Sequence, residues 1–222
     1  MTDFLLLLLS ASTLTIGLAV TSALVGLVMA IVLALLESTP VRWISMLTRG
    51  YILIMRGLPE LLIVLLVYFG SSHVLFLLTG QFVEISAFFC GVLALSSIFA
   101  VYVSQILRGA LLAIPKGQWE AGLALGMGRL GIFFRLLLPQ VWRHALPAMG
   151  NQWLVLLKDT ALVSLIGVND LMKQTQIIAS STWEPFTWFS CAALIYLLIT
   201  LISQYGLKRM NWYVTRHERG EA

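Results

Sequence analysis

Long apolar runs separated by short polar segments dominate this sequence. Five of the runs have about 20 residues or more, the length that an α-helix needs to cross the hydrocarbon core of a bilayer. They cover residues 10–36, 58–78, 85–107, 144–166 and 185–207. Because the runs are continuous and do not alternate as short barrel strands do, we expect an all-α integral membrane protein with five transmembrane helices.

The composition agrees with this class. Of the 222 residues, 59% are hydrophobic and only 11% are charged. A soluble domain of this composition would expose large adhesive patches. No low-complexity segment and no separate soluble domain is visible, so we expect one transmembrane domain over residues 1–222. The first run is preceded by Asp3 and by no Lys or Arg, and it therefore lacks the basic start of a cleaved signal peptide.

Basic residues gather on one side of the predicted spans, and this distribution sets the orientation. Twelve of the 14 lie in the segments after spans one, three and five: Arg42, Arg49, Arg56, Arg108, Lys116, Arg129, Arg135, Arg143, Lys208, Arg209, Arg216 and Arg219. The opposite loops contain Lys173, and Lys158 falls within span four. Because cytoplasmic loops carry such an excess, we expect a periplasmic N-terminus and a cytoplasmic C-terminus. Topology thus explains the net charge of +4 without nucleic acid.

The first basic segment has a regular spacing. Arg42, Arg49 and Arg56 are seven residues apart and therefore share roughly one face of a helix. One interpretation is a helix at the membrane surface, or at the start of a span, with snorkelling arginines. The alternative is a site for anionic lipid or for a partner subunit. The following Gly57-Leu58-Pro59 breaks and restarts the helix, because proline suits a first turn.

The loop over residues 108–143 is the longest polar stretch. Pro115 begins a helix that Gly126 ends, because glycine accepts a left-handed conformation. A second helix is expected over 128–137, and Pro139 ends it. Glycines are costly in helices, yet this loop contains Gly117, Gly122, Gly126, Gly128 and Gly131. We expect a helix–turn–helix on the cytoplasmic face that a docking partner approaches closely; the alternative is a loosely ordered connection.

The same loop carries a motif with a defined spacing. It reads Glu120-Ala121-Gly122, three residues, Gly126, nine residues, then Leu136-Leu137-Leu138-Pro139. It resembles the coupling loop of ABC importer permeases, whose pattern is Glu-Ala-Ala, three residues, Gly, nine residues and Ile-x-Leu-Pro. The departures are Gly122 and Leu136. The resemblance implies that six residues couple the pore to a cytoplasmic ATPase: Glu120, Ala121, Gly122, Gly126, Leu138 and Pro139.

Other segments extend the resemblance over nearly the whole chain. Residues 56–60, 113–121 and 157–162 look like the polar amino-acid branch of these permeases. Residues 152–172 and 184–188 look closest to the Q-type subunits of bacterial arginine transporters. The resemblance implies the type I importer permease fold, a bacterial inner (cytoplasmic) membrane, and a heterodimer with a related M-type permease. It also implies two ATPase subunits, which bind the ATP, and a periplasmic or lipoprotein solute-binding protein.

Charges at membrane depth are the candidate substrate contacts. A charged group there costs at least about 2.5–3.5 kcal/mol. Glu60 starts span two after a proline, where it either contacts a guanidinium or stabilises the helix N-terminus. Lys158 and Asp159 point about 100° apart on a helix, and a break near them would favour a substrate site over a structural ion pair or interfacial anchor. The predicted substrate-binding set is Glu60, Asp159, Thr160 and Ser164.

Catalytic chemistry has no support in the sequence. No glycine loop followed by Lys-Ser/Thr is present, so the chain is not expected to be an enzyme or to carry a cofactor. His73, His144 and His217 are scattered, which argues against a metal site. Cys90 and Cys191 lie in apolar runs, where packing is their expected role.

We therefore expect the permease subunit of an ATP-driven amino-acid importer, with arginine or another basic amino acid as substrate. The alternatives are an importer for histidine, lysine or a neutral polar amino acid, an ATP-independent channel or carrier, and a membrane scaffold. Secondary carriers usually contain repeated halves, and no internal repeat is evident here. Five spans without a repeat indicate half of a dimeric pore.

Overall fold

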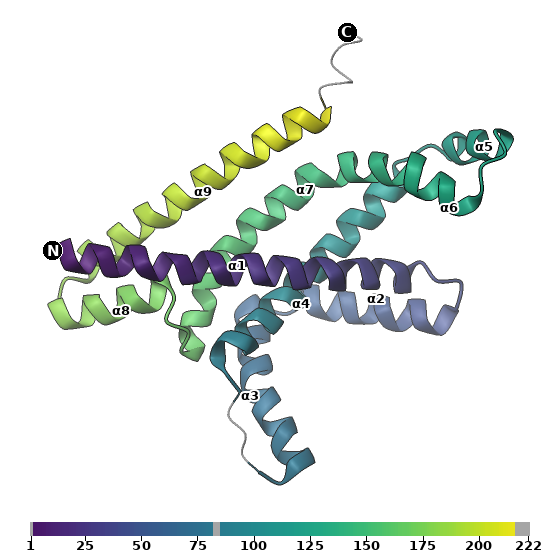
Figure 1. The fold of residues 1–222 in the computed structure, drawn as a ribbon. Coiled ribbons are helices and arrows are strands. Elements are labelled where there is room, and N and C mark those ends of the chain that lie inside the picture. Colours follow the sequence, from purple (N-terminus) through teal and green to yellow (C-terminus); the bar gives the residue numbers. More distant parts are fainter. Residues whose placement is uncertain (1, 82–84, 216–222) are drawn as a thin grey trace.

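The computed structural model describes residues 2–81 and 85–215, and these residues form helices joined by short connections. The elements are α1 (Thr2–Glu37), α2 (Arg42–Gly57), α3 (Glu60–Thr79), α4 (Ala87–Leu112), α5 (Lys116–Ala124), α6 (Arg129–Ile132), the π-helical turn η1 (Phe133–Leu137), α7 (Leu138–Asp159), the 3-10 helix η2 (Thr160–Ile166), α8 (Leu171–Thr182) and α9 (Pro185–Thr215). The predicted all-α class is confirmed for this part of the chain. Figure 1 shows their arrangement.

Four of the described helices are long and apolar enough to cross a membrane: Asp3–Glu37, Glu60–Thr79, Ala87–Leu112 and Pro185–Val214. They contain most of predicted spans one, two, three and five. The fourth predicted span, 144–166, is divided between the end of α7 and η2. The five-span count and the orientation of the termini therefore stay predictions.

Helix α4 lies at the centre of the packing. It contacts α1, α3, α7 and η2, and most of its apolar side chains are buried. The closest approach is to α1, where a Cβ on Gly26 would lie 2.8 Å from Phe99 Cδ1 and 2.9 Å from the Ser96 carbonyl oxygen. The Ser96 hydroxyl also donates to the Ser22 carbonyl at 3.1 Å. Small residues thus let two apolar helices pack backbone to backbone, as membrane helices commonly do.

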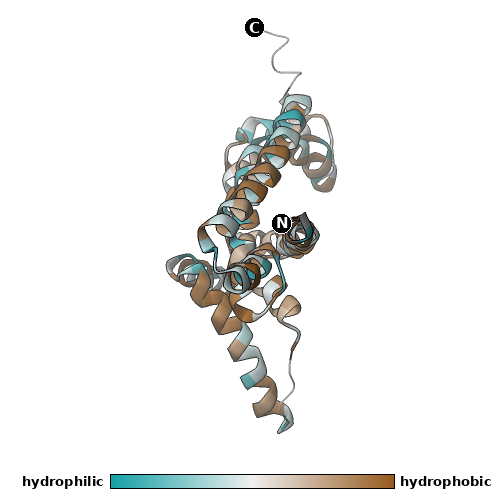
Figure 2. Ribbon diagram, turned by 90° about the vertical axis from the view of Figure 1, so that its left-hand side faces the viewer, coloured by the Kyte–Doolittle hydropathy of each residue, from teal (hydrophilic) through white to brown (hydrophobic). Residues whose placement is uncertain are grey.

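Helices α3 and α9 are different, because few of their apolar side chains are buried. In both views α3 extends away from the other helices, and Figure 2 shows it mainly hydrophobic (Figure 1, Figure 2). Exposed apolar helices of this size need lipid or another subunit around them. These two helices therefore need lipid or a further subunit as their surroundings.

Pro139 does not end a helix, which corrects the sequence prediction. A proline lacks an N–H and clashes with the carbonyl four residues before it. The chain avoids that conflict through the wider turn η1, in which the Leu138 N–H donates to the Phe133 carbonyl. Helix α7 then begins at Leu138, and Pro139 stands near its start, where no intrahelical donor is required. The loop thus continues directly into α7.

Candidate functional site at the coupling loop and in the membrane

The coupling loop folds as the predicted helix–turn–helix, with α5 and α6 joined by a tight turn. Gly126 has a φ of 73°, in the left-handed region. Its N–H donates to the Leu123 carbonyl at 2.9 Å, and the Met127 N–H donates to the Gly122 carbonyl at 3.0 Å. These two bonds cap the end of α5 in a Schellman motif. The predicted helix stop at Gly126 is thus confirmed, and its coupling role stays a prediction.

Gly122 has a role inside the chain. It is buried, and a Cβ at this position would lie 2.8 Å from Ile132 Cγ1 and 3.2 Å from Leu136 Cδ1. The glycine therefore lets α5 pack closely on α6 and η1. The sequence predicted that another backbone comes close at this position, and in the structure the close neighbours are helices of the same chain. Gly117, Gly126 and Gly128 have no such contact with the described residues.

The hairpin presents an exposed surface at one end of the molecule (Figure 1). Glu120 and Ala121 are exposed. Large apolar side chains accompany them, namely Leu123, Leu125, Leu130 and Phe134, with 48 to 79% of each exposed. A polar segment that exposes several large apolar side chains has the composition of a docking surface. The structure thus gives the predicted coupling residues a surface on which a partner protein can pack.

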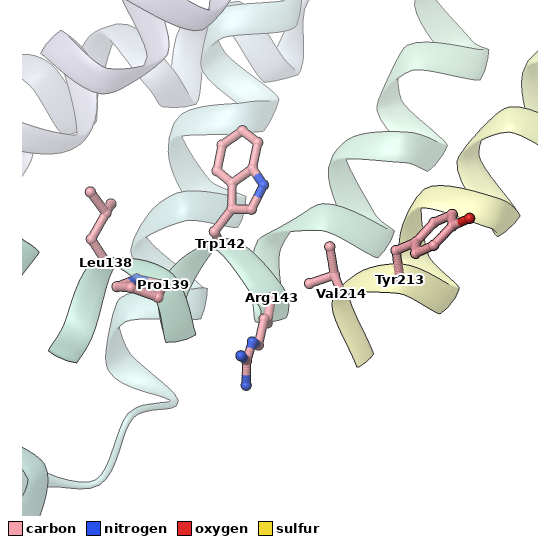
Figure 3. A pocket seen from close by; sticks show the side chains of 6 residues that line it. All are labelled: Leu138, Pro139, Trp142, Arg143, Tyr213 and Val214. Atoms are coloured by element: carbon pink, nitrogen blue, oxygen red, sulfur yellow. The ribbon is translucent and has the colours of Figure 1, made fainter. Parts of the chain in front are cut away.

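Leu138 and Pro139 lie apart from that surface. They line a groove of about 630 Å³ with Trp142, Arg143, Tyr213 and Val214. Figure 3 shows these side chains on two separate helices, the start of α7 and the end of α9. The six predicted coupling residues are thus divided between the α5–α6 hairpin and this α7–α9 groove.

Two acidic side chains from distant parts of the sequence interact where α3 begins and α7 ends. Glu60 is the first residue of α3, and Asp159 is the last residue of α7 before the change to a 3-10 helix. The Asp159 carboxyl interacts with the carboxyl of Glu60, and both side chains are partly exposed. The helix change at Asp159 is the break that the sequence favoured. We call Glu60 and Asp159 the acidic pair.

The neighbours of the acidic pair have different surroundings. Lys158 is exposed and lines a cavity of about 250 Å³ beside α8 and α9, so it faces other neighbours than Asp159. Thr160 and Ser164 are 0% and 1% exposed. Their hydroxyls donate to the carbonyls of Leu157 at 2.7 Å and Ala161 at 2.8 Å. In this structure both hydroxyl protons are used inside the helix, and their contact with a substrate stays a prediction.

One charged cluster was missed by the sequence reasoning. Glu37, at the end of α1, is only 4% exposed. Its carboxylate lies 2.8 Å from the Arg108 guanidinium and 3.6 Å from that of Arg49, and it accepts from Gln105 Nε2 at 2.6 Å. These partners lie on α2 and α4, so no spacing of residues along the sequence could have predicted that they contact Glu37. The available signal was that Glu37 is the sole acidic residue between Asp3 and Glu60.

Comparisons with known proteins agree with these features. The family model "Binding-protein-dependent transport system inner membrane component" matches residues 24–209. The arginine ABC transporter permease protein ArtQ of Haemophilus influenzae is 55% identical over 218 residues, covering 98% of each chain. ArtQ of Escherichia coli is 54% identical over 227 residues, covering 95% of each. A solved amino acid ABC transporter with histidines has a TM-score of 0.84 at 33% identity and covers 95% of each chain.

Proposed function

The chain belongs to the family of binding-protein-dependent transport system inner membrane components, and on this premise we propose that it is the pore-forming subunit of an ATP-driven arginine importer in a bacterial inner membrane. The observation that carries the choice of a cationic substrate is the acidic pair of Glu60 and Asp159. The arginine-transporter relatives support the same choice.

The acidic pair suits a guanidinium. Two carboxylates held together repel each other when both are ionised, and a cation between them relieves the repulsion. A guanidinium offers five N–H donors in one plane, so it can bridge two carboxylates or bind one of them in a bidentate manner. Both groups stand at helix interruptions, where irregular backbone in a membrane usually lines a cavity or a path for solutes. A neutral side chain gains none of this attraction.

Helix α7 joins the coupling motif to the acidic pair. The motif ends at Leu138 and Pro139, which are the first residues of α7, and Asp159 is its last residue. These 22 residues, with Pro147 in the interior of the helix, rise by about 33 Å along it. We propose that ATP binding and hydrolysis on partner subunits move the α5–α6 hairpin, and that α7 carries this movement to Asp159. The acidic pair would then hold or release its cation as the pore changes access.

The assembly that this proposal requires contains several chains. The coupling surface needs a cytoplasmic ATPase, of which we propose two copies. We propose that a second permease, a related M-type subunit, covers part of the exposed apolar helices α3 and α9. A periplasmic or lipoprotein solute-binding protein would deliver the amino acid. The 12 basic residues in the segments after spans one, three and five support five spans with the N-terminus outside and the C-terminus inside.

Uptake by the reconstituted assembly tests the proposal. Liposomes that contain the chain with its permease, ATPase and binding-protein partners should accumulate labelled arginine when ATP is enclosed on the ATPase side. Unlabelled lysine, histidine and glutamine serve as competitors. Uptake that persists without the ATPase would favour a channel or carrier instead. Histidine is the second candidate, because the similar solved transporter contains histidines; stronger competition by histidine than by arginine would favour it.

A further inference from the structure

A further cavity lies between α2 and the ends of α1 and α4. Its volume is about 430 Å³, and its lining is Glu37, Arg49, Ile52, Leu53, Arg56, Gly57 and Gln105. Two of the three regularly spaced arginines of α2 thus face one hollow. We call it the α2 cavity. It lies on the side proposed to face the cytoplasm.

The charges around the α2 cavity do not balance. Arg49, Arg56 and Arg108 surround the single carboxylate of Glu37, which leaves a net charge of about +2. Glu37 Oε1 is paired with Arg108 at 2.8 Å, and Glu37 Oε2 accepts from Gln105. Arg49 is the looser partner at 3.6 Å, and its side chain is 61% exposed. The excess positive charge therefore belongs to Arg49 and Arg56.

Arg56 is held in place without an anionic partner. Its guanidinium carbon lies 5.5 Å above the ring centroid of Tyr102 on α4. This cation–π contact orients the guanidinium plane. Among residues 2–81 and 85–215, no carboxylate forms an ion pair with it. A stacked arginine with unused N–H donors beside a cavity is ready to bind an anion that enters from outside.

The rim of the α2 cavity is apolar. Leu53, part of its lining, is 74% exposed. An anion that binds at Arg49 and Arg56 therefore meets exposed hydrocarbon surface beside it. Inorganic phosphate would leave this surface uncovered, whereas acyl chains would cover it.

We propose that the α2 cavity binds the phosphate headgroup of an anionic phospholipid, whose acyl chains lie along α2. Arginine matches phosphate oxygens with a planar pair of donors. The site prefers phosphatidylglycerol to phosphatidylcholine, because the choline cation would meet the net positive charge of the cavity. A basic residue near an anionic lipid surface contributes roughly 5-fold in affinity, and the pair of arginines roughly 25-fold.

Native mass spectrometry of the delipidated transporter assembly tests this proposal. The probes are dioleoylphosphatidylglycerol and dioleoylphosphatidylcholine, titrated separately. We expect tighter binding of phosphatidylglycerol, and we expect R49Q/R56Q to reduce this preference by roughly 25-fold. R56Q alone touches none of the partners of Glu37 and should reduce it by roughly 5-fold. Arg42→Gln is the matched control, because Arg42 belongs to α2 but does not line the cavity.

Each contrary outcome overturns the assignment. If R49Q/R56Q keeps the lipid preference, the cavity is not the site. If Arg42→Gln lowers the preference as much as R56Q does, the attraction is a diffuse surface effect. Release of the lipid by inorganic phosphate at a similar concentration would identify a soluble anion as the ligand. If R56Q leaves lipid binding unchanged but makes the transporter assembly dissociate into single chains, Arg56 belongs to a subunit interface.

Discussion

Arg108 and Glu37 form an ion pair of 2.8 Å that joins the end of α4 to the end of α1. Glu37 is almost fully buried, whereas the Arg108 side chain is 35% exposed. The coupling loop begins directly after α4, so this pair fixes the end of the helix from which the loop extends. A buried carboxylate that loses its main partner is strongly destabilising.

The first prediction concerns this pair. Arg108→Gln should lower the free energy of unfolding by about 3 kcal/mol, the lower end for a broken buried pair, because Arg108 is partly hydrated. Glu37→Gln should restore part of the loss in the double variant, giving a coupling energy of about 0.5–3 kcal/mol. Denaturant titration of the purified chain in detergent measures both values. Arg129→Gln, an exposed change in α6, is the control. Additive effects of the two changes would contradict a direct pairing.

The second prediction concerns the start of α8. The Thr15 hydroxyl of α1 accepts a hydrogen bond of 3.0 Å from the Leu171 N–H, and both residues are fully buried. Thr15→Val keeps the shape but leaves this donor unsatisfied, which should cost about 1–3 kcal/mol of stability. Thr13→Val removes an exposed hydroxyl from the same helix and serves as the control. Equal melting temperatures of the two variants would show that the bond contributes nothing.

The apolar runs were sufficient to predict most of the fold. They located four long apolar helices, because a helix must satisfy its own backbone groups in a membrane. Glycine and proline predicted the hairpin, since glycine readily adopts the left-handed conformation that Gly126 has at the end of α5. The consequence of Pro139 was not predictable in this way. Whether a helix ends before a proline or widens into a π turn depends on the packing of the neighbouring helices.

Individual residues of the candidate site could be predicted from the sequence, but the contacts between them could not. Glu60 and Asp159 were each conspicuous as acids in apolar surroundings, yet 98 residues separate them and no spacing indicates that they meet. Glu37 was missed for the same reason, because its partners lie on α2 and α4. Gly122 was assigned to a docking partner, whereas its close neighbour is Ile132 of the same chain. Contacts between different helices decide all three cases.

The third prediction concerns coupling. Gly126→Leu forces a branched side chain into the left-handed region, at a cost of about 1–2 kcal/mol, and should distort the α5–α6 turn. We expect weaker association with the ATPase or ATP hydrolysis without uptake, while membrane insertion is retained. Co-purification and paired assays of hydrolysis and transport measure this. Gly117→Ala is the control, because Gly117 lies in α5 with no described neighbour in its way. Normal transport by Gly126→Leu would contradict the coupling role.

The fourth prediction concerns topology. The distribution of basic residues predicts that a reporter fused after Arg219 reports the cytoplasm and that one inserted near Gly80 reports the periplasm. The segment near Gly80 is a suitable position, because α3 ends there and no other part of the described chain packs within 4 Å of the position that a Gly80 Cβ would take. Paired phosphatase and fluorescent-protein fusions give opposite readouts at each site. The reverse pattern at either position would exclude the five-span orientation.

The last prediction concerns the acidic pair. If Glu60 and Asp159 hold a guanidinium away from bulk water, each charge-assisted bond contributes about 1.5–3 kcal/mol. Glu60→Gln or Asp159→Asn should then weaken arginine transport by roughly 10- to 150-fold. The two effects should not add, because one cation is shared by two carboxylates. Each substitution keeps the side-chain shape, so it tests the charge directly.

The competing role for Glu60 is stabilisation of the α3 N-terminus, which its place in the first turn permits. That role contributes about 0.3–1 kcal/mol to stability and does not depend on which substrate is transported. The assay is ATP-driven arginine uptake with saturating binding protein, because the binding protein otherwise filters substrates first. Glu184→Gln, an exposed acid before α9, is the matched control. If Glu60→Gln assembles and transports arginine with unchanged rate and concentration dependence, Glu60 is a helix-end residue and the cation must be held elsewhere.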